Sequence, residues 1–321
     1  MTTLITGGTG FLGAEVTRLL IERGNAPLVL FDVVPSTGRL GELAKQVELV
    51  QGDIGDFSQV LNVVKTFRPK VVYHLGGMLS VPSEANPGAA MRVNVLGTFY
   101  VLEAARLFGV SQVLFSSTAA TYASDILEKT INDYTLQRPQ FFYGATKLFS
   151  EHLGLFFRRK YGLDFRAVRY PSVVGPGVST PGVVQYTSWM IEESAKGNAY
   201  TIYVKPETRC PVIYFKDAAR AIVKLGEAPA ENIKMVNYVV SGAPPIATAR
   251  ELAALVKAKI PGAQIDFKPD LELQKILDKS LLPIDDSIAR REWGWSPEYD
   301  QTRIVDDFVE EMRKHPERYT S

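Results

Sequence analysis

Tyr143 and Lys147 stand four residues apart in a stretch with helical periodicity, so we expect both side chains on one face of a helix, one turn apart. A phenol has a pKa of about 10 in water, and a neighbouring ammonium group favours its ionised form. Such a tyrosine could take a proton from a substrate hydroxyl group as a general base. The alternative is a surface pair, because tyrosine and lysine are common on exposed helices.

Three hydroxyl side chains, Ser116 to Thr118, follow an apolar run that is typical of a buried strand. Open α/β sheets bind their ligands at the carboxyl ends of the strands, where this cluster would lie. Thr118, which precedes Tyr143 by 25 residues, could donate a hydrogen bond to a reacting oxygen and stabilise the charge that develops on it. The simpler alternative is that these hydroxyl groups cap or solvate the strand end.

A glycine-rich turn, TGGTGFLG, separates the first apolar run from the first helical stretch. Either Gly7 or Gly8 combines with Gly10 and Gly13 to give the spacing of a dinucleotide-binding turn. Glycine at these positions permits a tight turn and lets a pyrophosphate approach the backbone at the helix N-terminus, where N–H groups are free. The alternative, an ordinary loop, does not account for the strand and helix that flank the turn.

Other candidates for a dinucleotide site follow the next apolar runs. Asp32 ends the second run, 19 residues after Gly13, where a carboxylate accepts hydrogen bonds from the ribose hydroxyls and repels a 2′-phosphate. This favours NAD over NADP. Asp53, after the third run, could accept a hydrogen bond from the adenine amine or could simply cap a turn. Gly76 and Gly77, after the fourth run, would let the backbone pass close to a cofactor.

Composition excludes several classes of protein. The chain has 321 residues, 46% of them hydrophobic and 22% charged, which is enough apolar surface for folded domains. A net charge of +1 argues against nucleic acid or an anionic membrane as a partner. The single cysteine, Cys210, cannot form an internal disulfide, and the three histidines are too far apart in the sequence to suggest a metal site. With no recognisable secretory signal at residues 1–8, we expect a cytoplasmic protein.

Short apolar runs alternate with helical stretches in the first half of the chain. Continuous apolar runs predict strands that are covered on both faces, and the alternation predicts a parallel sheet with right-handed crossovers. The expected fold class is α/β, a Rossmann-type doubly wound parallel sheet with a smaller, discontinuous C-terminal substrate lobe. The predicted strands are Thr3–Thr6, Leu28–Phe31, Glu48–Val50, Val71–Leu75, Val113–Ser116 and Phe165–Arg169, and the predicted helices are Phe11–Glu22, Phe57–Phe67, Ala89–Phe108 and Tyr143–Tyr161.

The pattern changes near residue 170, where a stretch rich in glycine and proline begins. We expect residues 1–170 to form the dinucleotide-binding domain and residues 171–321 to form most of the substrate lobe, with residues 205–228 returning to the first domain. The elements expected after residue 170 are strands at Tyr200–Val204, Val236–Val240 and Gln264–Phe267, and helices at Val184–Lys196, Ala249–Lys259, Ser287–Glu292 and Gln301–Lys314.

Taken together, TGGTGFLG, Asp32, HLGG, Asn94 in RVNVLGTFYVLEAA, LFSSTAATY and YGATK resemble the extended short-chain dehydrogenases/reductases, which include sugar-nucleotide epimerases and dehydratases. The resemblance covers essentially the whole chain. It implies bound NAD, catalysis by Thr118, Tyr143 and Lys147, and contact of Lys147 with the nicotinamide ribose. The cofactor contacts that it implies are Gly7, Gly10, Phe11, Leu12, Gly13, Asp32, Asp53, Ile54, Leu75, Gly76, Gly77, Asn94, Tyr143, Lys147 and Tyr170.

Within that family, KPETRCPVIYFKDAARAIVKL and LPIDDSIARREWGWSPEYD look like the L-threonine 3-dehydrogenases, as do GGMLSV and RYP. This implies oxidation of a small hydroxy amino acid, with Ser80, Thr118, Tyr143, Gly182 and Arg209 as substrate contacts. One stretch departs from the pattern. Where those enzymes carry GTTDYA, this chain has GVVQYT, so Val183 and Val184 replace two hydroxyl side chains. Burial of a charged group without replacement partners is unfavourable, which weakens the case for threonine itself.

Two alternatives stay open. VVGPG and TIY resemble the NDP-sugar 4-epimerases and dehydratases, in which Arg209 would bind a diphosphate, although Ser172 stands where those enzymes usually have asparagine. Arg209 could also form only a surface or interdomain salt bridge. A non-catalytic NAD-binding module is the other alternative, against which the presence of both Tyr143 and Lys147 argues.

The two long helical stretches Ala89–Phe108 and Tyr143–Tyr161 carry many apolar and aromatic residues. They could bury this surface on the sheet alone. Related enzymes instead pair these two helices with the same two helices of a second subunit, which implies a homodimer. The residues concerned are Val93, Leu96, Tyr100, Leu107, Phe149, Leu153, Phe156 and Phe157.

Overall fold

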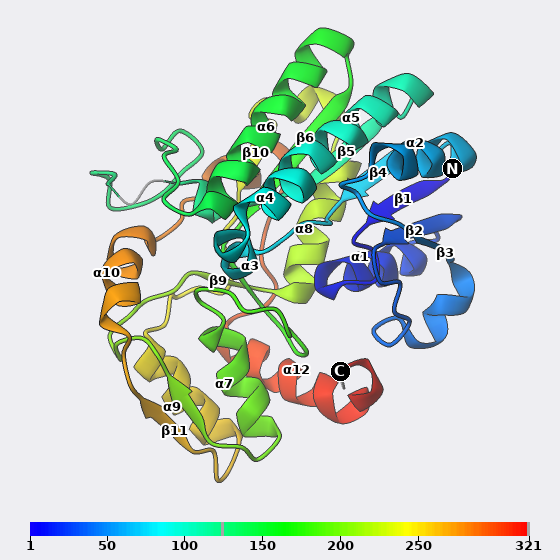
Figure 1. Ribbon diagram of the computed structural model, residues 1–321. Coiled ribbons are helices and arrows are strands. Elements are labelled where there is room, and N and C mark those ends of the chain that lie inside the picture. Colours follow the sequence, from blue (N-terminus) through cyan, green and yellow to red (C-terminus); the bar gives the residue numbers. More distant parts are fainter. Residues whose placement is uncertain (123–124, 320–321) are drawn as a thin grey trace.

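The computed structural model describes residues 1–122 and 125–319. Its centre is a parallel sheet of seven strands in the order β10-β6-β5-β4-β1-β2-β3 (Figure 1). This is the predicted Rossmann-type arrangement, in which the strand order reverses beside β1. The strands are β1 (Thr3–Thr6), β2 (Leu28–Asp32), β3 (Glu48–Gln51), β4 (Val71–His74), β5 (Gln112–Thr118), β6 (Asp164–Tyr170) and β10 (Asn237–Val239).

Helices cover both faces of the sheet, which explains the continuous apolar runs of the strands. On one face, α2 (Phe57–Phe67), α5 (Gly97–Phe108) and α6 (Phe142–Tyr161) pack in one hydrophobic cluster with residues such as Phe115 and Phe165. On the other face, α1 (Phe11–Glu22) packs beside α8 (Phe215–Glu227) in a second cluster (Figure 1). The predicted bounds of α1 and α2 are confirmed.

The helix predicted at Ala89–Phe108 is not uniform. It consists of α4 (Pro87–Ala90), a π-helical turn η2 (Met91–Leu96) and α5. A π-helical turn is rare and often marks a functional site. Here it carries the buried Asn94, whose position beneath the candidate site is described below.

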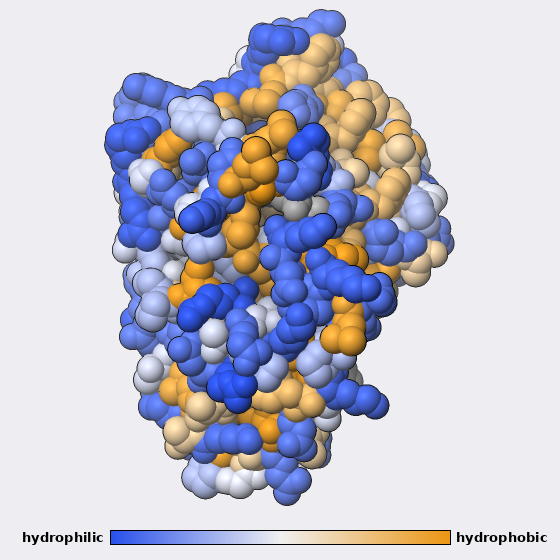
Figure 2. Space-filling model, turned by 90° about the vertical axis from the view of Figure 1, so that its left-hand side faces the viewer, coloured by the Kyte–Doolittle hydropathy of each residue, from blue (hydrophilic) through white to orange (hydrophobic). Residues whose placement is uncertain are grey.

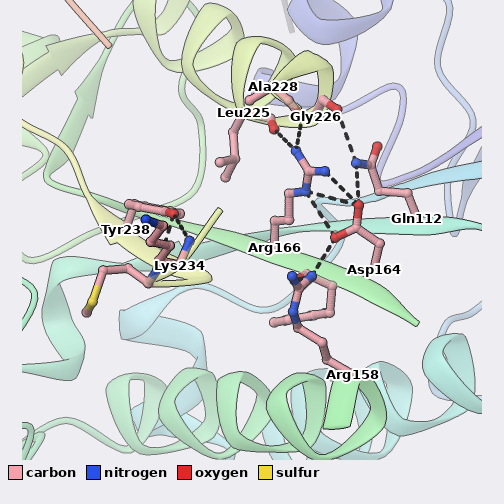
Figure 3. A network of polar contacts seen from close by, with 11 residues as sticks. Gln112, Arg158, Asp164, Arg166, Leu225, Gly226, Ala228, Lys234 and Tyr238 are labelled. Atoms are coloured by element: carbon pink, nitrogen blue, oxygen red, sulfur yellow. Dashed lines mark hydrogen bonds and ion pairs between the residues drawn. The ribbon is translucent and has the colours of Figure 1, made fainter. Parts of the chain in front are cut away.

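Helix α8 lies in the segment expected to return to the first domain, and it packs on β5 and β6. Arg166 of β6 holds the end of this helix by donating hydrogen bonds to the Leu225 oxygen at 2.6 Å and the Ala228 oxygen at 2.7 Å. Figure 3 shows Asp164 between Arg166 and Arg158 of α6, with Gln112 beside it. Arg166 is thereby paired with a carboxylate although its side chain is only 3% exposed.

One predicted strand has a different place from the one expected. The sequence predicts Val236–Val240 as a strand of the substrate lobe, whereas Asn237–Val239 forms β10 and extends the central sheet by pairing with β6. All three residues of β10 are buried, and the polar one, Asn237, donates a hydrogen bond to Glu151. A short apolar run does not reveal which sheet it joins, because the connection decides that.

The part of the chain expected to form the substrate lobe has a hydrophobic core of its own, which includes Met190, Val256 and Phe308. The lobe contains two strand pairs, β11 with β8 and β7 with β9. Its elements are β7 (Ser172–Val174), α7 (Tyr186–Ala195), β8 (Tyr200–Ile202), β9 (Val212–Tyr214), α9 (Ala249–Lys259), β11 (Ile265–Phe267), α10 (Leu271–Ser280), α11 (Ser287–Trp293) and α12 (Gln301–Lys314). In the described part of the chain, no helix combines the length and the apolar character needed to cross a membrane.

Candidate active site

A cavity of about 730 Å³ lies at the carboxyl ends of the central strands and reaches the substrate lobe. Residues from both parts of the molecule line it, as ligand sites at the switch point of such sheets usually do. All predicted site residues except Asn94 and Arg209 take part in its wall. They are Gly7, Gly10, Phe11, Leu12, Gly13, Asp32, Asp53, Ile54, Leu75, Gly76, Gly77, Ser80, Thr118, Tyr143, Lys147, Tyr170 and Gly182.

The glycine turn has the shape that a pyrophosphate needs. Gly7 has φ of +66°, a conformation that favours glycine, and its oxygen accepts a hydrogen bond from the Gly10 N–H at 3.1 Å. A Cβ atom on Gly13 would lie 2.0 Å from the Gly7 oxygen, so only glycine fits there. Helix α1 begins at Phe11 with the side-chain-free Gly10 as its cap, which leaves N–H groups directed at the cavity.

Asp32 lies at the end of β2 with its carboxylate held by Thr9, which donates from its N–H at 3.2 Å and from its hydroxyl group at 2.9 Å. Both bonds go to the same carboxylate oxygen, Oδ2, so the other oxygen has capacity for a ribose hydroxyl group. Arg39 also lies in the cavity wall, but its guanidinium group donates hydrogen bonds to the backbone oxygens of Pro176 and Gly177. Among the residues that the structure describes, Asp32 therefore has no ion-pair partner.

Asp53 has local partners for both carboxylate oxygens. Oδ1 accepts a hydrogen bond from the Gly55 N–H at 2.7 Å, and Oδ2 pairs with Arg92 at 2.7 Å. This geometry favours the turn alternative, although Asp53 still lines the cavity. Farther along the same wall, Gly76 follows β4 and lies so close to Gly7 that a Cβ atom on Gly7 would come within 2.8 Å of it.

Asn94, which the resemblance places among the cofactor contacts, lies behind the cavity wall. Its Oδ1 accepts a hydrogen bond from the Met78 N–H at 2.8 Å, and its Nδ2 donates to the Met78 oxygen and the Thr146 hydroxyl group, both at 3.1 Å. The amide is 3% exposed, and its hydrogen bonds are made within the protein. Asn94 therefore ties the loop after β4 to helix α6 instead of facing a ligand.

Thr118, Tyr143 and Lys147 come together as the sequence predicts. Thr118 ends β5, Tyr143 is the second residue of α6, and Lys147 lies one turn farther along that helix. Lys147 donates a hydrogen bond from Nζ to the Ser116 oxygen at 2.8 Å. Its Nζ lies 5.9 Å from the centre of the Tyr143 ring. The three side chains thus meet at the end of the strand where the hydroxyl cluster was expected.

The charges of this group differ from the sequence-based expectation. Burial raises the pKa of Tyr143 to about 12, and hydrogen bonding with Thr118 opposes this only in part. Burial also lowers the pKa of Lys147 to about 8, against the attraction of Glu151. The lysine at this distance therefore does not make Tyr143 a base by itself. A bound nicotinamide ring would add positive charge near Tyr143 and so favour its ionised form.

A buried ion pair below the site was not predicted. Glu151, 1% exposed, binds Arg169 of β6 at 2.7 Å and accepts a hydrogen bond from the Ser117 hydroxyl group at 2.5 Å. Arg169 also donates to the Tyr122 hydroxyl group in the cavity wall, at 3.1 Å. The signal was present in the spacing, because Glu151 follows Lys147 by one helical turn and therefore shares its face.

The predicted substrate contacts are only partly brought together. Ser80 begins the short helix α3 (Ser80–Ala85), and Gly182 lies in the segment before α7, and both line the cavity. Arg209 lies outside the cavity wall, with a side chain that is 58% exposed. It donates a hydrogen bond to the Ile246 oxygen and lies 3.9 Å from Glu251. These contacts fit the alternative given above for Arg209, in which it forms only a surface salt bridge.

Comparisons with known proteins agree with this geometry. A model of the NAD dependent epimerase/dehydratase family matches residues 3–241. The mitochondrial L-threonine 3-dehydrogenase of Bos taurus is 32% identical over 305 residues, which cover 94% of this chain and 80% of that protein. The crystal structure of L-threonine dehydrogenase from Phytophthora infestans has a TM-score of 0.87 at 31% identity and covers 98% of this chain and 99% of its own.

A UDP-glucose 4-epimerase from Thermus thermophilus, solved in complex with NAD, is also similar, with a TM-score of 0.85 at 26% identity over 98% of this chain and 99% of its own. The glycine turn, the acceptor at Asp32 and the free N–H groups of α1 fit the same cofactor here. The chain therefore belongs to the NAD-dependent epimerase/dehydratase family and is an NAD-dependent dehydrogenase of the extended short-chain dehydrogenase/reductase type.

Proposed function

We propose that the protein oxidises the secondary alcohol of a small hydroxy acid or hydroxy amino acid, in the manner of an L-threonine 3-dehydrogenase. The observation that carries the proposal is that one cavity joins the glycine turn to Thr118, Tyr143 and Lys147 and continues to Ser80. The L-threonine 3-dehydrogenases among the relatives and solved structures support it.

In the proposed reaction, Tyr143 takes the hydroxyl proton of the substrate while Thr118 holds the same oxygen. NAD, when bound, accepts the hydride from the carbinol carbon. Lys147 has two tasks: its ammonium group favours the phenolate of Tyr143 and binds the ribose next to the nicotinamide. Because the Ser116 oxygen holds Lys147 in place, the lysine is oriented before the substrate arrives.

The test is a substrate panel of L-threonine, related hydroxy acids and UDP-sugars, with NADH absorbance and sugar isomers measured separately. We expect net NADH with a small alcohol and no sugar isomerisation. Interconversion of UDP-glucose and UDP-galactose without net NADH would instead establish an epimerase, because an epimerase returns the hydride to its own intermediate. Cofactor binding without turnover on any member of the panel would indicate the non-catalytic NAD-binding alternative.

Asp32→Ala is expected to weaken NAD binding about tenfold or more and to bring the NADP and NAD affinities closer together, because the ribose loses a charged acceptor and the 2′-phosphate loses a repelling charge. Titration calorimetry with both cofactors measures this. Asp53→Ala is the matched control, because Asp53 already pairs with Arg92 and should not set the cofactor ratio. Equal affinity of the unchanged protein for NADP and NAD would contradict the role of Asp32.

We also propose a homodimer through α5 and α6. Both helices expose large apolar side chains, including Leu107, Phe149 and Phe156, which are 48%, 54% and 37% exposed. Figure 2 shows hydrophobic residues gathered at the upper right of the view. This side of the molecule faces the viewer in Figure 1, where α5 and α6 lie in front of the sheet. Light scattering is expected to give twice the mass of the 35.5 kDa chain, and Phe149→Glu with Phe156→Glu should halve it. A monomer at micromolar concentration of the unchanged protein would refute this.

A further inference from the structure

The end of the cavity that reaches the substrate lobe is walled by aliphatic side chains. Val183 and Val184 enter it from the segment before α7, and four residues enter it from α10 and the chain that follows, namely Leu277, Leu281, Leu282 and Ile284. Val183, Val184 and Leu277 also pack on the core of the substrate lobe, and Leu277 is 1% exposed. The wall is therefore a fixed part of the lobe.

This aliphatic wall is continuous with the reacting centre. Leu282 and Ile284 pack in one cluster with Tyr122, Ile131 and Ala119, the last of which is adjacent to Thr118. A bridge between Ile131 and Ile284 joins the two segments directly. If Thr118 and Tyr143 bind the hydroxyl group of the substrate, the substituent on its carbinol carbon would thus contact the aliphatic side chains next to them.

The charged residues of the cavity lie away from this aliphatic end. In the cavity wall as the structure describes it, the charged residues are Asp32, Arg39, Asp53, Arg92 and Lys147. Asp53 and Arg92 pair with each other, and Lys147 and Arg39 donate to backbone oxygens. These charges lie on the cofactor side or at the reacting centre. The segments that carry the aliphatic side chains add neutral polar residues to the wall instead, among them Thr180, Gln185 and Ser280.

Neutral donors of this kind can bind a single carboxylate, but an ammonium group beside the aliphatic wall would lose its hydration without an anionic partner. Among the described residues of the cavity wall, a diphosphate would meet no free cation at this end either, which separates it from a sugar-nucleotide site. Alkyl groups, by contrast, gain roughly fourfold in affinity for each methylene that such a surface buries.

We propose that the preferred substrate is a 3-hydroxy acid without a 2-ammonium group, carrying an alkyl chain longer than the methyl group of threonine. The proposal rests on the proposed function and names its substrate class. The hydroxyl proton goes to Tyr143 and the hydride from the same carbon goes to NAD, so that the products are the 3-oxo acid, NADH and a proton.

The experiment compares kcat/KM for L-threonine, both enantiomers of 3-hydroxybutyrate and both enantiomers of 3-hydroxyhexanoate, with NADH formation as the readout. We expect kcat/KM to rise from threonine to 3-hydroxybutyrate and again to 3-hydroxyhexanoate, by at least about tenfold in all. The double variant Val183→Thr, Val184→Thr should lose most of this preference for the longer alkyl chain, because it replaces two aliphatic side chains of the wall with hydroxyl-bearing ones.

Val34→Thr is the matched control, since Val34 is 69% exposed and lies outside the cavity wall. It should leave the substrate preference unchanged. A higher kcat/KM for L-threonine than for both 3-hydroxybutyrate and 3-hydroxyhexanoate would overturn the inference and leave the proposed function standing. Sugar isomerisation without NADH, or no NADH from any hydroxy acid, would overturn the proposed function and the inference with it.

Discussion

Replacing Tyr143 with phenylalanine is expected to lower turnover by about 100-fold or more while NAD binding stays close to that of the unchanged protein. The ring remains and fills the same space, so the cavity keeps its shape. Only the proton acceptor is lost. Single-turnover measurement of NADH formation, together with titration calorimetry of NAD, separates the two effects.

The pH dependence follows from the same group. Burial raises the pKa of Tyr143 to about 12, so the phenol by itself is protonated at neutral pH. Oxidation needs the phenolate, and the rate should therefore rise with pH until the pKa of Tyr143 in the cofactor complex is reached. Tyr143→Phe should remove this rise. Tyr134→Phe is the matched control, because Tyr134 is 76% exposed, and near-normal turnover of Tyr143→Phe would contradict the assignment.

The fold was largely predictable because its signals are local. Continuous apolar runs mark strands with two covered faces, and the glycine turn fixes where β1 ends and α1 begins. The place of β10 was not predictable in this way. A short run of three buried residues is equally compatible with the central sheet and with the substrate lobe. The packing of α8 on β5 and β6 is what brings the chain back to pair with β6.

In the candidate site, too, residues placed by local geometry were predictable and residues placed by tertiary contacts were not. Residues at strand ends and on one helix face, such as Asp32, Thr118 and Tyr143, line one cavity because regular geometry places them there. Asn94 and Arg209 depend on tertiary contacts, and those contacts turn them toward Met78 and toward Ile246 instead. A motif identifies a position in a family, but the partners of a side chain decide whether it faces a ligand.

The buried pair below the site carries the last prediction. Glu151→Gln is expected to lower the free energy of unfolding by about 3–5 kcal/mol, because it leaves the Arg169 guanidinium buried without a counter-charge. Burial alone would lower the pKa of Arg169, but hydrogen bonds and attraction from Glu151 hold it above its usual range. Chemical denaturation measures the loss of stability.

The same substitution should act on catalysis through Lys147. Burial lowers the pKa of Lys147 to about 8 and Glu151 opposes this shift, so removal of the carboxylate lowers that pKa further. His74, a further titratable group near the lysine besides Glu151 and Tyr143, stays neutral, because burial and then the charge of Lys147 lower its pKa to about 3. The proposed reaction needs the ammonium form of Lys147, so kcat/KM should fall again as the pH rises past the pKa of this lysine. In the Glu151 variant this alkaline fall should move to lower pH.

Two further variants separate this electrostatic effect from a loss of stability. Glu192→Gln removes another buried glutamate, which pairs with Lys196 in the substrate lobe, and should lower stability without moving the alkaline fall. The double variant Glu151→Gln, Arg169→Met removes both buried charges and should recover part of the stability, since neither charge is then left unpaired. Its alkaline fall should stay shifted, because Lys147 still lacks the carboxylate one turn below it. If both Glu151 variants kept the profile of the unchanged protein, the pair would serve only to hold α6 on β6.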